Sequence, residues 1–162
     1  YMGNTSDASL CPEDETCAVN CGLGRTDYIR RYGVTASGSE LRINYVRWTS
    51  NGENVGARPY LLEDESTYQT FDLLENEFIF EVVANMPCGL NGALYFSQMP
   101  DDDCLSSPTK MTGAKYSAGF YDSQCPRDLK FIDQGNVSGW VPSADSNSGI
   151  GTHGSFCPEM HI

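Results

Sequence analysis

The clearest indication of the fold class lies in the segment Glu77-Phe78-Ile79-Phe80-Glu81-Val82-Val83-Ala84. Phe78, Phe80 and Val82 occupy alternate positions, and Glu77 and Glu81 fall on the opposite face. Because successive side chains of a strand point to opposite faces, this period of two predicts a half-buried β-strand. The residues that we expect in the core on this argument are Phe78, Phe80, Val82, Leu94 and Phe96.

Further short strands are expected on both sides of this segment, separated by turns that are rich in Gly, Pro, Asn and Ser. With residues 77–84, the predicted strands are 41–48, 58–62, 68–73, 93–98, 130–132, 137–141 and 160–162. One short helical turn is expected near residues 14–20, and residues 142–154 form a long polar loop. This pattern favours an all-β antiparallel sandwich. No linker is visible, so we assign residues 1–162 to one domain.

The composition excludes several classes of partner. The chain has 162 residues, and 22 acidic against 10 basic residues give a net charge of −12. No basic cluster is present, so nucleic acid is not an expected partner. No apolar run approaches the roughly 18 residues that a membrane span needs. Neither argument indicates an oligomeric state.

The seven cysteines favour an oxidising compartment. Their odd number leaves at least one without an intramolecular partner, and their spacing does not match a zinc site. We expect no metal and no cofactor. Two sequons, Asn4-Thr5-Ser6 and Asn136-Val137-Ser138, are compatible with a secreted glycoprotein.

Three motifs together resemble glycoside hydrolase family seven, the secreted cellulases. They are Pro87-Cys88-Gly89-Leu90-Asn91-Gly92-Ala93-Leu94-Tyr95-Phe96, Asp122-Ser123-Gln124-Cys125-Pro126-Arg127-Asp128-Leu129-Lys130-Phe131 and Cys157-Pro158-Glu159-Met160-His161-Ile162. The resemblance implies a concanavalin A-like β-sandwich, or jelly roll, that is incomplete here. It also implies a secreted, extracellular enzyme of which this chain is the N-terminal portion of the catalytic domain.

The family resemblance assigns catalytic roles to the last motif. The family's active strand has the pattern Glu-x-Asp-x-x-Glu. Enzymes of the family hydrolyse β-1,4-glucosidic bonds with retention, using two carboxyl groups about 5–5.5 Å apart. Glu159 matches the nucleophile, and His161 stands at the position of the assisting Asp. The acid/base Glu is expected beyond Ile162. The 162 residues alone are therefore expected to be inactive.

The resemblance also assigns residues that line the substrate path. Their side chains can donate and accept hydrogen bonds with neutral glucose hydroxyls, and a tyrosine ring can stack on a pyranose. The expected cellulose- or cello-oligosaccharide-binding residues are Arg58, Asn91, Tyr95, Asp122, Gln124 and Lys130. The loop at residues 142–151 resembles that of cellobiohydrolases. An endo-β-1,4-glucanase, in which this loop is commonly shorter, is the second choice.

The family pattern of disulfides implies one bridge within the chain, between Cys11 and Cys17. Cys125 and Cys157 are expected to lie near one another, because two further family bridges join their segments and each has lost one half. The two cysteines could pair directly.

Two alternatives remain open at this point. The substitution by His161 could mark a catalytically inactive β-glucan-binding sandwich. The chain could also be a secreted interaction protein that shares only the fold. The sequence following Ile162 would discriminate between these alternatives and the hydrolase, because a Trp-Glu there would supply the second carboxyl group.

Overall fold

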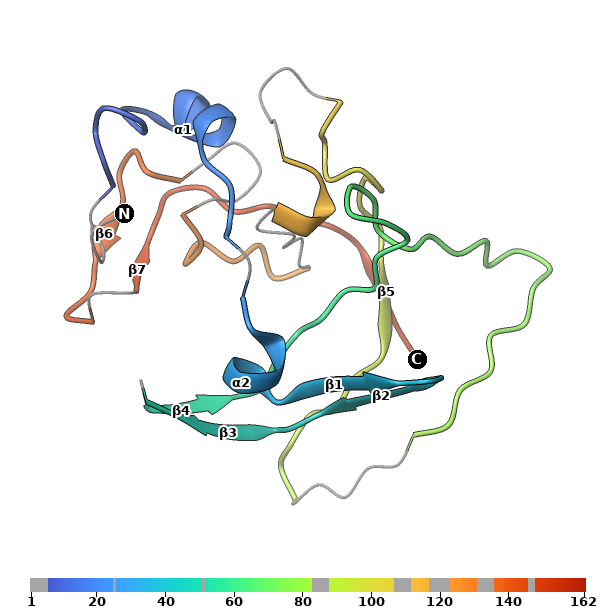
Figure 1. The fold of residues 1–162 in the computed structure, drawn as a ribbon. Coiled ribbons are helices and arrows are strands. Elements are labelled where there is room, and N and C mark those ends of the chain that lie inside the picture. Colours follow the sequence, from blue (N-terminus) through green and yellow to red (C-terminus); the bar gives the residue numbers. More distant parts are fainter. Residues whose placement is uncertain are drawn as a thin grey trace. The chain divides into compact units, whose positions relative to one another are not determined.

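A computed structural model describes residues 6–24, 26–50, 52–82, 88–106, 112–116, 123–130, 136–145 and 148–162 (Figure 1). The chain divides into two compact units. One is Gly24–Leu61, and the other combines Tyr1–Leu23 with Leu62–Ile162. The described residues hold eight strands and only two short α-helices, as expected of an all-β protein.

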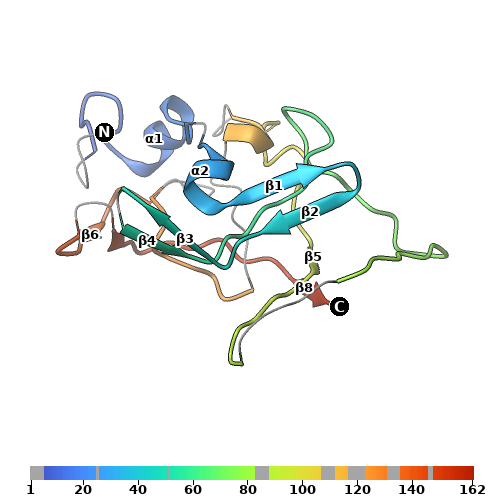
Figure 2. The same cartoon turned by 60° about the horizontal axis from the view of Figure 1, so that its bottom comes forward.

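The unit Gly24–Leu61 consists of helix α2 (Tyr28–Tyr32) followed by two hairpins (Figure 2). Strands β1 (Val34–Ser37) and β2 (Glu40–Ile43) form the first hairpin. Strands β3 (Val46–Thr49) and β4 (Gly52–Val55) form the second. Gly33 ends α2 with φ of 65°, a left-handed conformation that favours glycine.

Two strand predictions in this region were wrong in detail. Residues 41–48 are not one strand, because the chain leaves the first hairpin at Asn44 and enters the second at Val46. Residues 58–62 contain no strand, although Leu62 forms an isolated bridge to Tyr68. Side-chain alternation in the sequence does not reveal where a strand exchanges one pairing partner for another.

The larger unit contains helix α1 (Asp14–Asn20), the 3₁₀ turn η1 (Ala114–Tyr116) and two strand pairs. Strand β5 (Tyr95–Ser97) pairs with β8 (Glu159–His161), and β6 (Val141–Pro142) pairs with β7 (Gly149–Ile150). The helix at 14–20, a strand within 93–98 and the last strand are confirmed. Of residues 137–141, only the last belongs to a strand, and residues 131–132 lie outside the described part.

The predicted strands 68–73 and 77–84 are wrong within the described residues, where no ladder forms over 69–82. The ring of Phe78 packs against those of Phe80 and Phe96, at centroid distances of 5.6 and 5.3 Å, in one continuous aromatic cluster. Phe71 joins this cluster beside Phe96. Alternation therefore predicted the shared face correctly. A strand also needs a hydrogen-bonded neighbour, which residues 77–82, the described part of this segment, lack.

The predicted core was also wrong. Phe78, Phe80, Val82 and Leu94 keep at least 40 % of their surface exposed, and Phe96 is half-buried. The apolar residues that are buried in the described part of the chain are instead Cys11, Cys17, Ala18, Tyr68, Ala114 and Cys157.

The sequon at Asn136 is not available for glycosylation in the folded chain. The Asn136 side chain is fully buried, and its amide nitrogen donates to the carbonyls of Arg127, Leu129 and His153. Its amide oxygen accepts from the His153 backbone N–H. The other sequon asparagine, Asn4, lies outside the described residues.

Among the described residues, no helix has the length and apolarity needed to cross a membrane.

Candidate functional site

The candidate site is one face of the β5–β8 ladder, whose two strands lie side by side in Figure 2. The register pairs Tyr95 with His161 and Ser97 with Glu159. Directly opposed residues of an antiparallel pair share a face, and so do residues two apart on one strand. These four side chains therefore gather on a single polar face. Phe96 and Met160, which are also paired, occupy the opposite face.

Glu159, the predicted nucleophile, has a side chain that is only 4 % exposed. The Ser123 hydroxyl donates a hydrogen bond to its Oε2 at 3.0 Å. A carboxylate withdrawn from water needs such partners, because desolvation penalises the charged form. The turn that carries Ser123 thus holds a buried carboxylate on β8 in a defined orientation.

His161 lies beside this carboxylate, with its Nε2 atom 3.4 Å from Glu159 Oε2. Its ring stacks on Tyr95 at a centroid distance of 5.0 Å and an interplanar angle of 18°. The His161 side chain is 60 % exposed, so water screens any charge on it. His161 is therefore a neighbour of Glu159 that the Tyr95 ring orients and that pairs with it ionically only when protonated.

Ser97 completes the polar face and was missed by the sequence analysis. Its hydroxyl oxygen is buried and has no hydrogen-bond partner among the described residues. Leaving a buried hydroxyl in that state costs about 1–3 kcal/mol. Ser123 lies within one of the family motifs but was not predicted as a site residue either. Neither serine has a distinctive sequence signal, since its role depends on strand register and on a turn from a distant segment.

The remaining predicted substrate residues are only partly placed by the structure. Asn91 is exposed in the segment that leads into β5, and Gln124 is exposed next to Ser123. Lys130 is half-buried, with its ammonium 5.1 Å from the centroid of the Trp140 ring. Asp122 lies outside the described residues. Arg58 is half-buried in the unit Gly24–Leu61, so its position relative to Glu159 stays a prediction.

The cysteine predictions have mixed outcomes. The Cys11–Cys17 disulfide is confirmed, with a Cα–Cα distance of 4.1 Å. Cys125 and Cys157 are not joined by a disulfide, so the direct bridge is not formed. Cys21 brings a third sulfur within 4.8 Å of the first two. Because the disulfide removes two of the three thiolates that a metal would need, this group is not a metal site.

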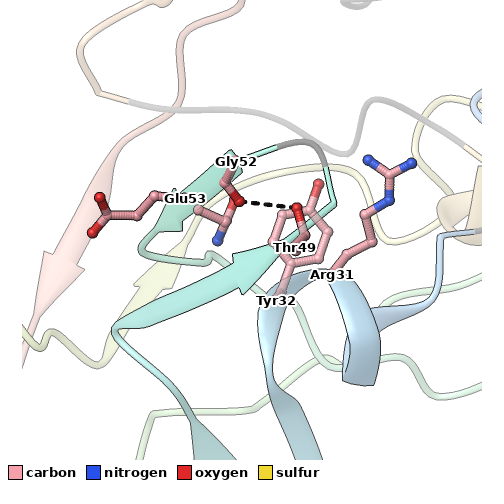
Figure 3. Close-up of a pocket in the computed structure, with 6 residues that line it drawn as sticks. Arg31, Tyr32, Thr49, Gly52 and Glu53 are labelled. Carbon is pink, nitrogen blue, oxygen red and sulfur yellow. Dashed lines mark hydrogen bonds between the residues drawn. The ribbon is translucent and has the colours of Figure 1, made fainter.

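A shallow pocket of about 150 Å³ lies within the unit Gly24–Leu61 (Figure 3). Its lining residues are Arg31, Tyr32, Thr49, Gly52, Glu53 and Asn54. The Thr49 hydroxyl donates to the Gly52 carbonyl at 3.0 Å across the end of the second hairpin. None of the residues predicted to bind substrate or to catalyse lines this pocket.

Comparison with known proteins gives one family and several related structures. The family model for glycosyl hydrolase family 7 matches residues 1–162. The chain is 37 % identical to a family 7 cellobiohydrolase from Daphnia pulex, with a TM-score of 0.73. This match covers 100 % of the present chain and 38 % of the Daphnia pulex chain. A cellobiohydrolase from Melanocarpus albomyces, solved with cellotetraose, is 35 % identical with a TM-score of 0.77, at 100 % and 39 % coverage.

The chain therefore spans about two fifths of the length of these relatives. Their fold assigns the chain to the all-β, antiparallel sandwich class, or jelly roll, and confirms the fold class that the sequence indicated.

Proposed function

Because the chain belongs to glycosyl hydrolase family 7, we propose that it provides the nucleophile strand of a secreted, retaining cellobiohydrolase. The observation that supports this most directly is the placement of Glu159. It projects from β8 onto the polar face, almost buried, with Ser123 bonded to its Oε2 atom. This is the arrangement that a carboxylate nucleophile requires, since it must stay ionised and oriented.

In the proposed reaction, a Glu159 oxygen bonds to the anomeric carbon as the glycosidic C–O bond breaks. The leaving oxygen takes a proton from a second carboxylic acid, and water later cleaves the glycosyl ester with that residue acting as base. By the family pattern, this second residue lies beyond Ile162. We propose that the 162 residues alone do not hydrolyse the substrate, because general acid catalysis contributes about 10²–10⁴-fold.

The proposed substrate is a cello-oligosaccharide or a cellulose chain. The Melanocarpus albomyces relative was solved with cellotetraose, which supports this choice. On this chain, the stacked Tyr95 and His161 rings supply flat surface beside the nucleophile. The side chains proposed to hydrogen-bond the glucose hydroxyls are Arg58, Asn91, Asp122, Gln124 and Lys130. The Cys11–Cys17 disulfide is typical of the oxidising, extracellular setting in which such an enzyme would act.

The test is release of the chromophore from an aryl β-lactoside by the 162-residue chain and by the protein extended beyond Ile162. We expect hydrolysis by the extended protein alone, and its loss in Glu159→Gln. A matched control is Glu40→Gln, an exposed glutamate on β2 that should leave hydrolysis unchanged.

Binding of cellotetraose without hydrolysis by the extended protein would instead support the inactive glucan-binding sandwich. If activity then appeared in His161→Asp, the substitution at this position would be what had silenced the enzyme.

A further inference from the structure

The proposed function leaves one buried polar group of the site unused, the hydroxyl of Ser97. Its oxygen is buried without a hydrogen-bond partner among the described residues, although it lies on the same face as Glu159. Buried polar groups nearly always have partners, so an unsatisfied one beside a buried carboxylate calls for a physical explanation.

The strand register places Ser97 directly opposite Glu159. Cβ atoms in such pairs are about 4.5–5.5 Å apart, so the two side chains are neighbours across the ladder. The backbone beside the pair is held on one side by the ladder of β5 and β8 and on the other by the Gln98 N–H, which donates to the Pro158 carbonyl at 2.9 Å. Only side-chain rotation is then needed to change the distance between hydroxyl and carboxylate.

The chemistry of the two groups is complementary. An ionised carboxylate accepts hydrogen bonds at about four positions, and a serine hydroxyl can donate from any of three staggered χ1 positions. Ser123 approaches from a separate turn and engages Oε2. A second donor from β5 would hold the carboxylate from another direction. The exposed His161 ring does not replace this donor, since its Nε2 atom lies 3.4 Å from the same Oε2 atom that Ser123 engages.

We propose that Ser97 is a positioning residue that rotates about χ1 to donate a hydrogen bond to the Glu159 carboxylate. The nucleophile is then held by two serine hydroxyls, one from β5 and one from the turn at Ser123. This inference rests on the proposed role of Glu159 as nucleophile.

The test compares two substitutions of equal shape, Ser97→Thr and Ser97→Val. Threonine keeps the hydroxyl and valine lacks it, so their difference isolates the hydrogen bond from packing. The first readout is the carboxylate stretching band of Glu159 in the ¹³C-glutamate-labelled chain, identified by subtraction of Glu159→Gln. We expect the band to move to higher frequency in the valine variant and to stay close to its original position in the threonine variant.

The second readout is hydrolysis by the extended protein. A hydrogen bond to a charged group is typically strong enough for the valine variant to lose about tenfold in kcat/KM relative to threonine. The loss should fall on kcat, with KM nearly unchanged.

The chain contains a matched control in Ser37, which pairs directly with Glu40 in the exposed β1–β2 hairpin. Ser37→Val and Ser37→Thr should leave the Glu159 band and kcat/KM unchanged. Equal band positions for the Ser97 valine and threonine variants would overturn the inference, even if the extended protein is active. A band shift in an extended protein that does not hydrolyse would support the inference and contradict the proposed function.

Discussion

Replacement of Asn136 by alanine should destabilise the chain more than a change at any exposed asparagine. Its side-chain amide makes four hydrogen bonds, three donated to carbonyls at 2.9–3.2 Å and one accepted from the His153 N–H at 3.1 Å. These bonds join the segment at residues 127–130 to the segment at 151–153. The fit is tight, since a Cβ added to Gly151 would lie 1.9 Å from Asn136 Oδ1.

The size of the effect follows from what alanine leaves behind. The His153 N–H and the carbonyls that accept from the Asn136 amide would each lose a hydrogen-bond partner next to a buried position. Each unsatisfied group costs about 1–3 kcal/mol, and water entering the space would recover part of it. We therefore expect a loss of about 2–5 kcal/mol, a large fraction of the roughly 5–15 kcal/mol that stabilises a typical domain.

Urea unfolding followed by tryptophan fluorescence would measure this loss. The control is Asn76→Ala, because the Asn76 amide also donates to two carbonyls, those of Asp72 and Leu74, but is exposed. A loss below about 0.5 kcal/mol is expected there. Equal losses for the two variants would refute the reasoning. So would a glycan mapped to Asn136 in the native protein secreted from a glycosylating host.

Three further predictions concern other groups. The backbone N–H of Ser106 donates a hydrogen bond to the Asp102 carboxylate and lowers the pKa of that carboxyl below 3.8. The stabilisation of the turn by this hydrogen bond should thus be present at neutral pH and be lost as pH falls through the lowered pKa. Hydrogen exchange of the Ser106 amide would detect this loss, and Asp102→Asn should abolish the pH dependence. Exposed Cys125 should react with iodoacetamide in the native chain, and Cys157, 1 % exposed, only after unfolding. In the extended protein, His161→Gln should change hydrolysis by no more than about fivefold, because an exposed ion pair contributes at most about 1 kcal/mol; a larger loss would contradict this.

The sequence allowed the elements with local signals to be predicted. The short helix at 14–20 and the strand that begins at Glu159 are present. The segment at 77–84 shows where such reasoning stops. Its alternation placed Phe78 and Phe80 on one face, and their rings do pack together. Strand formation, however, depends on a partner that alternation does not identify.

The site was predictable where residues resemble a family motif and unpredictable where they do not. Glu159, His161 and Tyr95 were named from such motifs, and the ladder brings them together. Ser97 and Ser123 could not be found in this way. A serine near a carboxylate becomes meaningful only when a strand register or a long-range turn places the two side by side.

The register of β5 against β8 determines which side chains share the polar face of the proposed site. Both strands alternate, with Phe96 and Met160 on one face and Glu159 on the other. A slip of one residue would turn one strand's side chains to the opposite face. Glu159 would then face the cluster that Phe96 forms with Phe71 and Phe78, where a carboxylate loses both water and hydroxyl donors. The aromatic contacts of Phe96 thus stabilise the register that delivers Glu159 to Ser123, so the apolar face of the ladder supports the chemistry proposed for the polar one.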